Sequence, residues 1–152
     1  MSITYSFYFK GNDGKFYPLD SFGGGSKVAE GMSAQFGRNC AYETRKPLTK
    51  SDLKEIISFE NDRAQSSENR IEEYRQRQKD IGSWNNSIED KIRMISDLDE
   101  TIDEEKCDLS YYKHSVHFFE FLSDILDEAE YSYSDDSNAK VDANDYIYWE
   151  VS

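Results

Sequence analysis

The fold is decided by residues 49–110, which run TKSDLKEIISFENDRAQSSENRIEEYRQRQKDIGSWNNSIEDKIRMISDLDETIDEEKCDLS. Apolar side chains recur in the first half of this stretch at spacings built from threes and fours, the period of one helix face. They are Leu53, Ile57, Ala64, Ile71, Tyr74 and Ile81. Thr49 followed by Asp52 predicts the start of this helix, because such a pair serves the exposed amides of a first helical turn.

A second stripe of the same period follows Gly82 and Ser83, which we interpret as the stop of one helix and the cap of the next. Its members are Trp84, Ile88, Ile92, Ile95, Leu98, Ile102 and Leu109. Folding the chain back about Gly82 matches the stripes along their length. The expected neighbours are Ile81 and Trp84, Tyr74 and Ile92, Ile71 and Ile95, Ala64 and Ile102, and Ile57 and Leu109. The prediction is an antiparallel helical hairpin about 50 Å long, a coiled-coil arm.

The N-terminal segment predicts a β-hairpin. Residues 3–10 place Ile3, Tyr5, Phe7 and Phe9 on one face of a half-buried strand. Residues 11–14 form a turn, and residues 15–19 return as a second strand, which Pro18 either places at an edge or ends. Residues 20–47 show no clear period and are expected to be irregular, with at most one short helix.

The segment after the arm predicts a core helix and a last strand. Apolar residues cover most of the helix circumference between residues 116 and 126, as in a buried helix. Residues 146–151 alternate as a strand that pairs with residues 130–134 or with the N-terminal strand. We therefore expect a single α+β domain, residues 1–152: a β-hairpin and irregular segment (1–48), a helical arm (49–110), and a core helix with C-terminal strands (111–152).

The bulk composition indicates a soluble, cytoplasmic protein. The chain has 152 residues, of which 14% are aromatic, more than disordered chains usually carry. It contains no apolar run of the roughly 20 residues needed to cross a membrane, and its start lacks the pattern of a signal peptide. Cys40 and Cys107 lie far apart, outside any CxxC pair, and are expected to be reduced thiols.

The negative charge is concentrated near the C-terminus. The net charge is −13, and residues 94–152 hold three Lys or Arg against seventeen Asp or Glu. Such a distribution disfavours direct binding of nucleic acid or anionic lipid and favours a basic partner, because opposite potentials steer encounter.

The richest acidic stretch is the run from residue 97 to residue 108. On a helix, Asp97, Glu100, Glu104 and Asp108 form one row with neighbours about 5–6 Å apart, a spacing comparable to that of phosphates along a nucleic-acid strand. The expected register brings few Lys or Arg side chains opposite this row, so its negative charge is expected to be exposed and uncompensated. The candidate partner-binding residues are Asp97, Asp99, Glu100, Asp103, Glu104, Glu105 and Asp108, together with Asp135 and Asp136. The alternative is a solvated helix face with no partner.

Three further constellations were weighed against simpler interpretations. Residues 22–27 hold three glycines and Lys27 but lack the spacing of a phosphate-binding loop. His114, His117 and Glu120 are close enough on a helix to bind a metal. They flank core residues, however, and are better explained as the solvent-facing edge of a buried helix. The acids and amides of residues 135–145 lack the glycine and final glutamate of an EF-hand and favour a solvated loop. We therefore expect no catalytic residue, metal or cofactor, and no enzymatic activity.

The resulting hypothesis is a non-enzymatic inhibitor whose acidic face occupies a basic surface of a partner, such as a nuclease or another nucleic-acid-binding enzyme. In size and charge alone, the chain is similar to small acidic phage proteins that disable restriction or CRISPR nucleases, and to nuclease immunity proteins. In this hypothesis the protein is a nucleic-acid mimic. The alternative is a structural or assembly protein whose coiled-coil arm forms a homodimer or docks on a larger complex.

Overall fold

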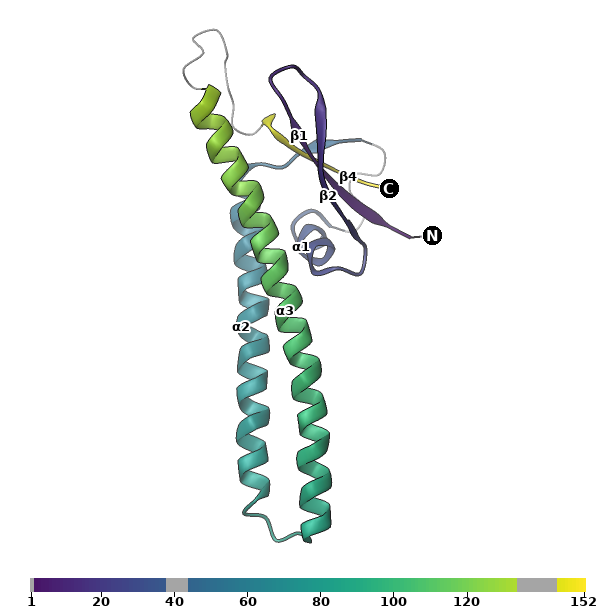
Figure 1. Ribbon diagram of the computed structural model, residues 1–152, viewed down its shortest axis with the longest axis vertical. Helices are drawn as coiled ribbons and strands as arrows, with labels where there is room; N and C mark the ends of the chain where they lie inside the picture. The colour runs from purple at the N-terminus through teal and green to yellow at the C-terminus, as the bar shows by residue number, and fades with distance from the viewer. Residues whose placement is uncertain (1, 38–43, 134–144) are drawn as a thin grey trace.

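The computed structural model describes residues 2–37, 44–133 and 145–152, which form a small sheet beside a long helical hairpin (Figure 1). The elements in chain order are β1 (Thr4–Lys10), β2 (Phe16–Gly23), α1 (Lys27–Phe36), β3 (Lys46–Pro47), α2 (Lys50–Ile81), α3 (Ile88–Tyr133) and β4 (Ile147–Val151). The predicted α+β class is confirmed. Among these described residues, no helix is long and apolar enough to span a membrane.

The sheet joins the two ends of the chain. Its strand order is β2-β1-β4-β3 and every neighbouring pair is antiparallel. β1 lies between β2 and β4, so the predicted pairing of the last strand with the N-terminal strand is confirmed. The predicted turn at residues 11–14 is also present, with Gly14 at a φ of 78°, and Pro18 lies on the edge strand as expected.

The core lies between the sheet and the upper half of the hairpin. Phe7 of β1 is fully buried, and its ring meets those of Phe118 and Phe119 of α3 edge to face, with centroids 5.0 and 6.3 Å away. On β4, Ile147, Trp149 and Val151 are buried. The predicted packing of a core helix on an aromatic sheet is thus confirmed.

The core helix and the second arm helix are one continuous element. α3 runs through 46 residues without a break, so the segment predicted as a separate core helix is its C-terminal part. Residues 130–133 belong to this helix as well. The alternative pairing of β4 with residues 130–134 is therefore wrong, because the helical backbone there already uses its hydrogen bonds within α3.

The tip of the hairpin differs from the prediction. α2 ends at Ile81 as expected, but α3 starts at Ile88, where Ser87 Oγ accepts from the Asp90 N–H at 3.2 Å. Ser83 is therefore not the second cap. Asn85 and Asn86 occupy the longer loop, and asparagine favours turns because its side chain bonds nearby backbone.

The longer loop shifts the register between the two helices. Gln78 Nε2 donates to the Ile95 carbonyl at 3.1 Å, whereas Ile71 was expected beside Ile95. The offset is seven residues, or about two helical turns. Ile71 and Ile102 remain buried in the hairpin, but Ile88 and Ile92 are 72% and 63% exposed, so the stripes do not match to the tip.

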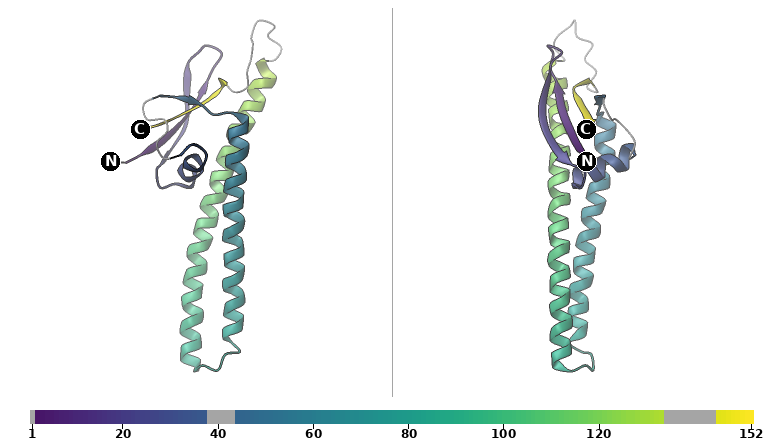
Figure 2. Two further views of the ribbon diagram at one scale, coloured as in Figure 1. Left: turned by 180° about the vertical axis from the view of Figure 1, so that it is seen from behind. Right: turned by 90° about the vertical axis from the view of Figure 1, so that its right-hand side faces the viewer.

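The described residues between 20 and 47 are more regular than predicted, and the one short helix that the prediction allowed is present. β2 continues to Gly23, and one short helix, α1, starts after Ser26, whose Oγ accepts from the Ala29 N–H. The helix buries Val28, Ala29 and Met32. Figure 2 shows that α1 and the sheet lie beside the upper half of the hairpin only, so that its lower half projects as an arm.

The predicted helix start at Thr49 is a full capping box, because Thr49 Oγ1 accepts from the Asp52 N–H and Asp52 accepts from the Thr49 N–H. Replacing Thr49 by alanine should lower the free energy of unfolding by about 1 kcal/mol in urea denaturation. The matched control is Thr101→Ala within α3, which should be nearly neutral because alanine favours helix interiors. Equal losses in both variants would contradict a role for the cap.

Candidate functional site

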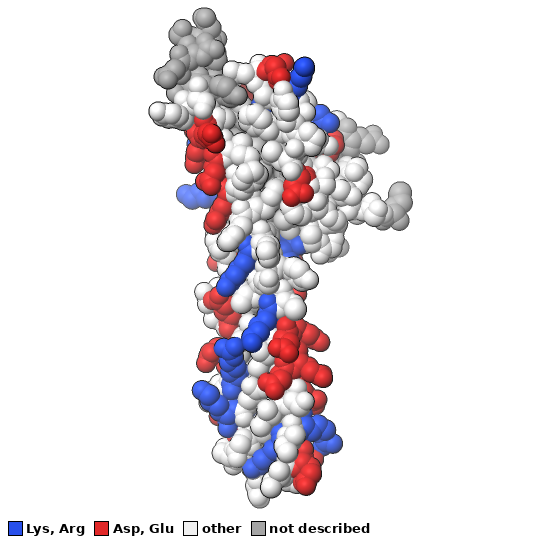
Figure 3. All heavy atoms as spheres, in the orientation of Figure 1, with Lys and Arg blue, Asp and Glu red and all other residues white. Residues whose placement is uncertain are grey.

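The acidic run of residues 97–108 lies on the projecting part of α3, in the arm below the sheet. Six of its seven acids are exposed, and Glu105 is half-buried. Figure 3 shows acidic side chains gathered on the α3 side of the arm, with Lys and Arg side chains beside them toward α2. The arm thus presents both signs of charge.

Three of the seven acids have partners within the molecule. Glu105 accepts from Arg70 Nε and from Ser67 Oγ, and only 15% of its side chain is exposed. Asp99 accepts from Gln78 Nε2 at 2.6 Å. Asp108 lies 3.9 Å from Lys27 Nζ of α1.

These contacts correct the expectation that the whole run is uncompensated. The two-turn shift in register places Gln78 and Arg70 beside acids that the predicted register left without partners. Lys27 belongs to α1, a helix whose position along the arm could not be derived from the spacing in α2 and α3.

Four acids of the run have no such partner in the part of the chain that the structure describes, and we call them the outer acidic patch: Asp97, Glu100, Asp103 and Glu104. All four are exposed, and none forms an ion pair with another of the described residues. Asp135 and Asp136, and with them residues 135–144 of the candidate calcium loop, lie outside the described residues. Among the described residues, the outer acidic patch is therefore the part of the predicted acidic run without an internal partner.

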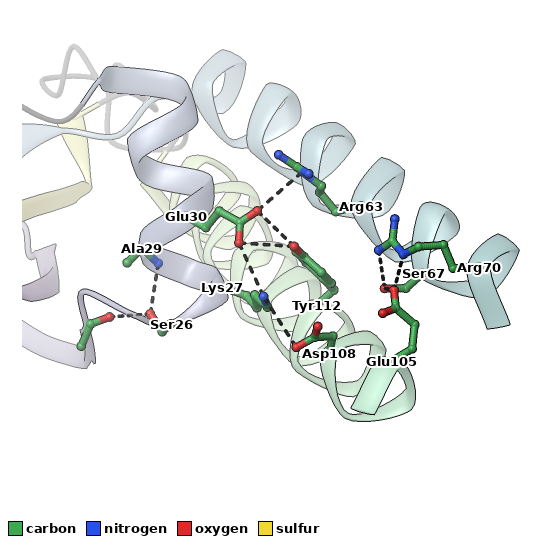
Figure 4. Close-up of polar contacts among 11 residues, drawn as sticks. Ser26, Lys27, Ala29, Glu30, Arg63, Ser67, Arg70, Glu105, Asp108 and Tyr112 are labelled. Atoms are coloured by element: carbon green, nitrogen blue, oxygen red, sulfur yellow. Dashed lines mark hydrogen bonds and ion pairs between the residues drawn. The ribbon is translucent and has the colours of Figure 1, made fainter. Parts of the chain in front are cut away.

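A second group of charges, which the sequence did not predict, lies where α1 meets the hairpin (Figure 4). We call Lys27, Glu30, Glu60, Arg63 and Tyr112 the junction cluster. Glu30 of α1 accepts from the Tyr112 hydroxyl of α3 at 3.1 Å and lies 3.5 Å from Arg63 Nε of α2. Lys27 Nζ lies 3.7 Å from Glu30 and 4.5 Å from the centre of the Tyr112 ring. The cluster joins all three helices.

The cluster perturbs its own ionisable groups. Burial raises the pKa of the Tyr112 hydroxyl, and its hydrogen bond to Glu30 adds to that effect. Burial alone would lower the pKa of Lys27, but Tyr112, Asp108 and Glu30 together raise it. Lys27 is therefore held as a cation between acidic groups.

Glu60 is the unusual member of the junction cluster. It is fully buried in α2, and neither carboxylate oxygen has a hydrogen bond of ordinary geometry to the described residues, although the Gly31 N–H is near enough to favour its charge slightly. Burial, reinforced by the charge of Glu30, raises the pKa of Glu60 to about 8, while Lys27 and Arg63 oppose the rise. A protonated, neutral Glu60 is therefore the dominant form at neutral pH.

The sequence did contain a signal for Glu60. It stands four residues after Ile56 and four before Ala64, both buried, so it occupies a position of the inward-facing stripe. A carboxylate at such an inward-facing position is unexpected, because Glu is almost never fully buried unless it is paired. The predicted stripe included Ile57 and omitted Ile56, which hid the position of Glu60 within it.

The structure does not support a metal centre at His114 and His117. His114 and His117 are exposed and line a groove of about 340 Å³ with Lys106, Leu109, Ser110 and Lys113. Within the described ranges, no group of three or more His, Cys, Asp or Glu is arranged to hold a metal. The lysines beside these histidines also disfavour a cation there.

Comparison with known proteins gives no relative for this chain: no family model, no curated protein and no solved structure matches it.

Gly31 is required by the junction cluster, because a Cβ at this position would lie 2.6 Å from Glu60 Oε1 and 3.1 Å from Ile56 Cγ2. Gly31→Ala should lower the free energy of unfolding by about 1–3 kcal/mol, as overpacked cores do, despite the better helix propensity of alanine. Urea denaturation measures this loss.

Gly25→Ala is the matched control, since nothing lies within 4 Å of a Cβ there and a change below about 0.5 kcal/mol is expected. In a Glu60→Ala background the Gly31→Ala penalty should shrink, because the clashing carboxylate is gone. An undiminished penalty in the double variant would show that Glu60 is not the cause.

Proposed function

We propose that the protein is a non-enzymatic inhibitor that binds a basic surface of a partner through the outer acidic patch. The observation that carries this proposal is the separation within the acidic run: three acids are engaged internally and the other four are exposed without an ion pair. Like charges one turn apart on a helix repel by a few tenths of a kcal/mol. A basic partner would relieve that repulsion, and among the described residues none forms an ion pair with these four carboxylates.

The kind of partner follows from the shape of the arm. α2 has 32 residues and is about 48 Å long, and two packed helices form a narrow rod that can enter a groove. Carboxylates along one such helix repeat at intervals similar to those of phosphates on a strand. These features support a partner whose basic groove ordinarily holds nucleic acid, such as a nuclease.

The binding energy in this proposal comes mainly from desolvated pairs between carboxylates and lysine or arginine side chains. Charge complementarity raises the association rate. The attraction weakens as salt is added, because the Debye length falls to about 8 Å at physiological ionic strength. The nearby cations of α2 would face a different part of the partner or remain in solvent.

Neutralising the outer acidic patch should weaken partner binding at least about tenfold, because each lost carboxylate removes a charge pair. The variant carries Asp97→Asn, Glu100→Gln, Asp103→Asn and Glu104→Gln. The immobilised full chain captures proteins from source-cell lysate, and the dissociation constant is then measured with the purified partner. Raising salt from about 50 to 200 mM should weaken wild-type binding, and duplex DNA should compete with it.

The matched control removes the same charge from exposed positions elsewhere: Asp62→Asn, Glu72→Gln, Asp124→Asn and Glu128→Gln. This variant should bind as the wild type does. If both variants lose affinity equally, net charge and not the patch would be responsible. Affinity unaffected by the patch variant and by salt would refute the proposal.

A specific observation supports assembly through the arm as a second candidate function. Trp84, Ile88 and Ile92 at the tip of the hairpin are 41%, 72% and 63% exposed. Large apolar side chains grouped on a surface are typical of protein contacts. The tip, and not the length of the arm, is the part that such an assembly would use, because Ile71 and Ile102 are already buried between α2 and α3.

If the tip mediates assembly, the wild type should be larger than a monomer by light scattering, and Ile88→Ser with Ile92→Ser should reduce its mass to that of one chain. The fold should survive, because both side chains are exposed. Ile71→Ser with Ile102→Ser is the informative comparison: it should lower the thermal midpoint by opening the hairpin. A wild-type mass of one chain at all concentrations would exclude self-assembly.

A further inference from the structure

Glu60 lies at the contact between α1 and the helical hairpin. Gly31 of α1 lies directly over its carboxylate, because a Cβ added at this glycine would lie 2.6 Å from Glu60 Oε1. Beside this contact, Met32 of α1 and Ile56 of α2 belong to the same buried core. While α1 is docked, Glu60 is fully buried and without a hydrogen bond of ordinary geometry among the described residues.

The ionisable groups around Glu60 come from every helix packed there. α1 contributes Glu30 and Lys27, α2 contributes Arg63, and α3 contributes Tyr112, with Asp108 acting on Lys27. Arg63 and Lys27 both lie close to Glu30, and Lys27 also lies 3.9 Å from Asp108, so two carboxylates already match their two positive charges. A negative charge on Glu60 would therefore have no cation of its own, and an unpaired buried charge is strongly unfavourable.

We propose that Glu60 is a proton-dependent latch: α1 docks on α2 and α3 with the Glu60 carboxyl protonated, and separation of α1 from the hairpin lets that carboxyl ionise in water. Docking then takes up one proton and separation releases one. Separation would also expose the apolar side chains of α1 and free Asp108 from Lys27. The latch thus controls both an apolar surface and one member of the acidic run.

The pH dependence follows from the two environments of the carboxyl. The pKa of Glu60 is about 8 while α1 is docked, and in water it returns to the ordinary glutamate value of 4.5. The equilibrium constant for docking of α1 is highest below pH 4.5 and falls about tenfold per pH unit as pH rises from there to about 8. Above pH 8 the contribution of the Glu60 proton to docking is lost. The latch is therefore strongest in acid and weakest above pH 8.

The test uses the full chain and two NMR measurements between about pH 5 and 9. The ¹³C shift of the Glu60 carboxyl reports its protonation, and hydrogen exchange, corrected for the intrinsic rate, reports the protection of amides in α1 and in β1. The carboxyl should titrate near pH 8. Protection in α1 should fall about tenfold per pH unit up to about pH 8 and then level off, while protection in β1 should change less.

Three variants separate the latch from a general effect of pH. Glu60→Gln should make the protection of α1 independent of pH, whereas Glu72→Gln, an exposed residue of the same helix, should behave as the wild type does. Glu30→Gln should lower the Glu60 titration midpoint and move the plateau to lower pH, because the charge of Glu30 raises the pKa of Glu60. The Glu30 variant retains Glu60 and serves if Glu60→Gln does not fold.

The proposal is overturned if the Glu60 carboxyl titrates near pH 4.5, or if protection in α1 does not change across this range. Parallel losses in α1 and β1 would also overturn it, since the whole domain and not α1 would then be responding. A Glu60→Gln variant with the pH dependence of the wild type would have the same consequence.

Discussion

The packing of α3 against both α2 and the sheet is the constraint on which the rest of the structure depends. The C-terminal part of α3 buries Phe119, Leu122 and Leu126 in the aromatic core. Its N-terminal part pairs with α2 to form the projecting arm (Figure 1). Because one helix serves both parts, the arm continues directly from the core. The acidic run therefore lies on the same helix that packs against the sheet.

The junction cluster includes a group whose burial opposes folding. Placing α1 against the hairpin buries a carboxylate that has no cation of its own, and such burial opposes folding unless the group is neutral. Glu60 meets that requirement by retaining its proton, and Gly31 by having no side chain. A methionine or leucine at position 60 would fill similar space without the penalty. The presence of an ionisable group there is what makes the contact sensitive to pH.

The acidic run divides according to the neighbours that the hairpin supplies. Asp99, Glu105 and Asp108 act within the molecule, where they connect α3 to α2 and to α1. Glu105 is the best shielded, so its contact with Arg70 contributes more than an exposed pair would. The outer acidic patch makes no such contribution among the described residues. Its four carboxylates raise the electrostatic energy of the arm, which is why the proposed partner is a basic one.

The sequence by itself determined most local elements: the β-hairpin, the Thr49 capping box, the helices on both sides of Gly82 and the last strand follow from period-2 and period-3.6 patterns and from caps, which are properties of neighbouring residues. The continuity of the second arm helix with the core helix was not predicted. Only the tertiary structure decided the register of α2 on α3, the docking of α1 and the burial of Glu60. Pairing between distant segments depends on loop geometry and on which side chains fit together. The loop after Gly82 shifted the helices by two turns, and that shift decided which acids acquired partners and which remained exposed.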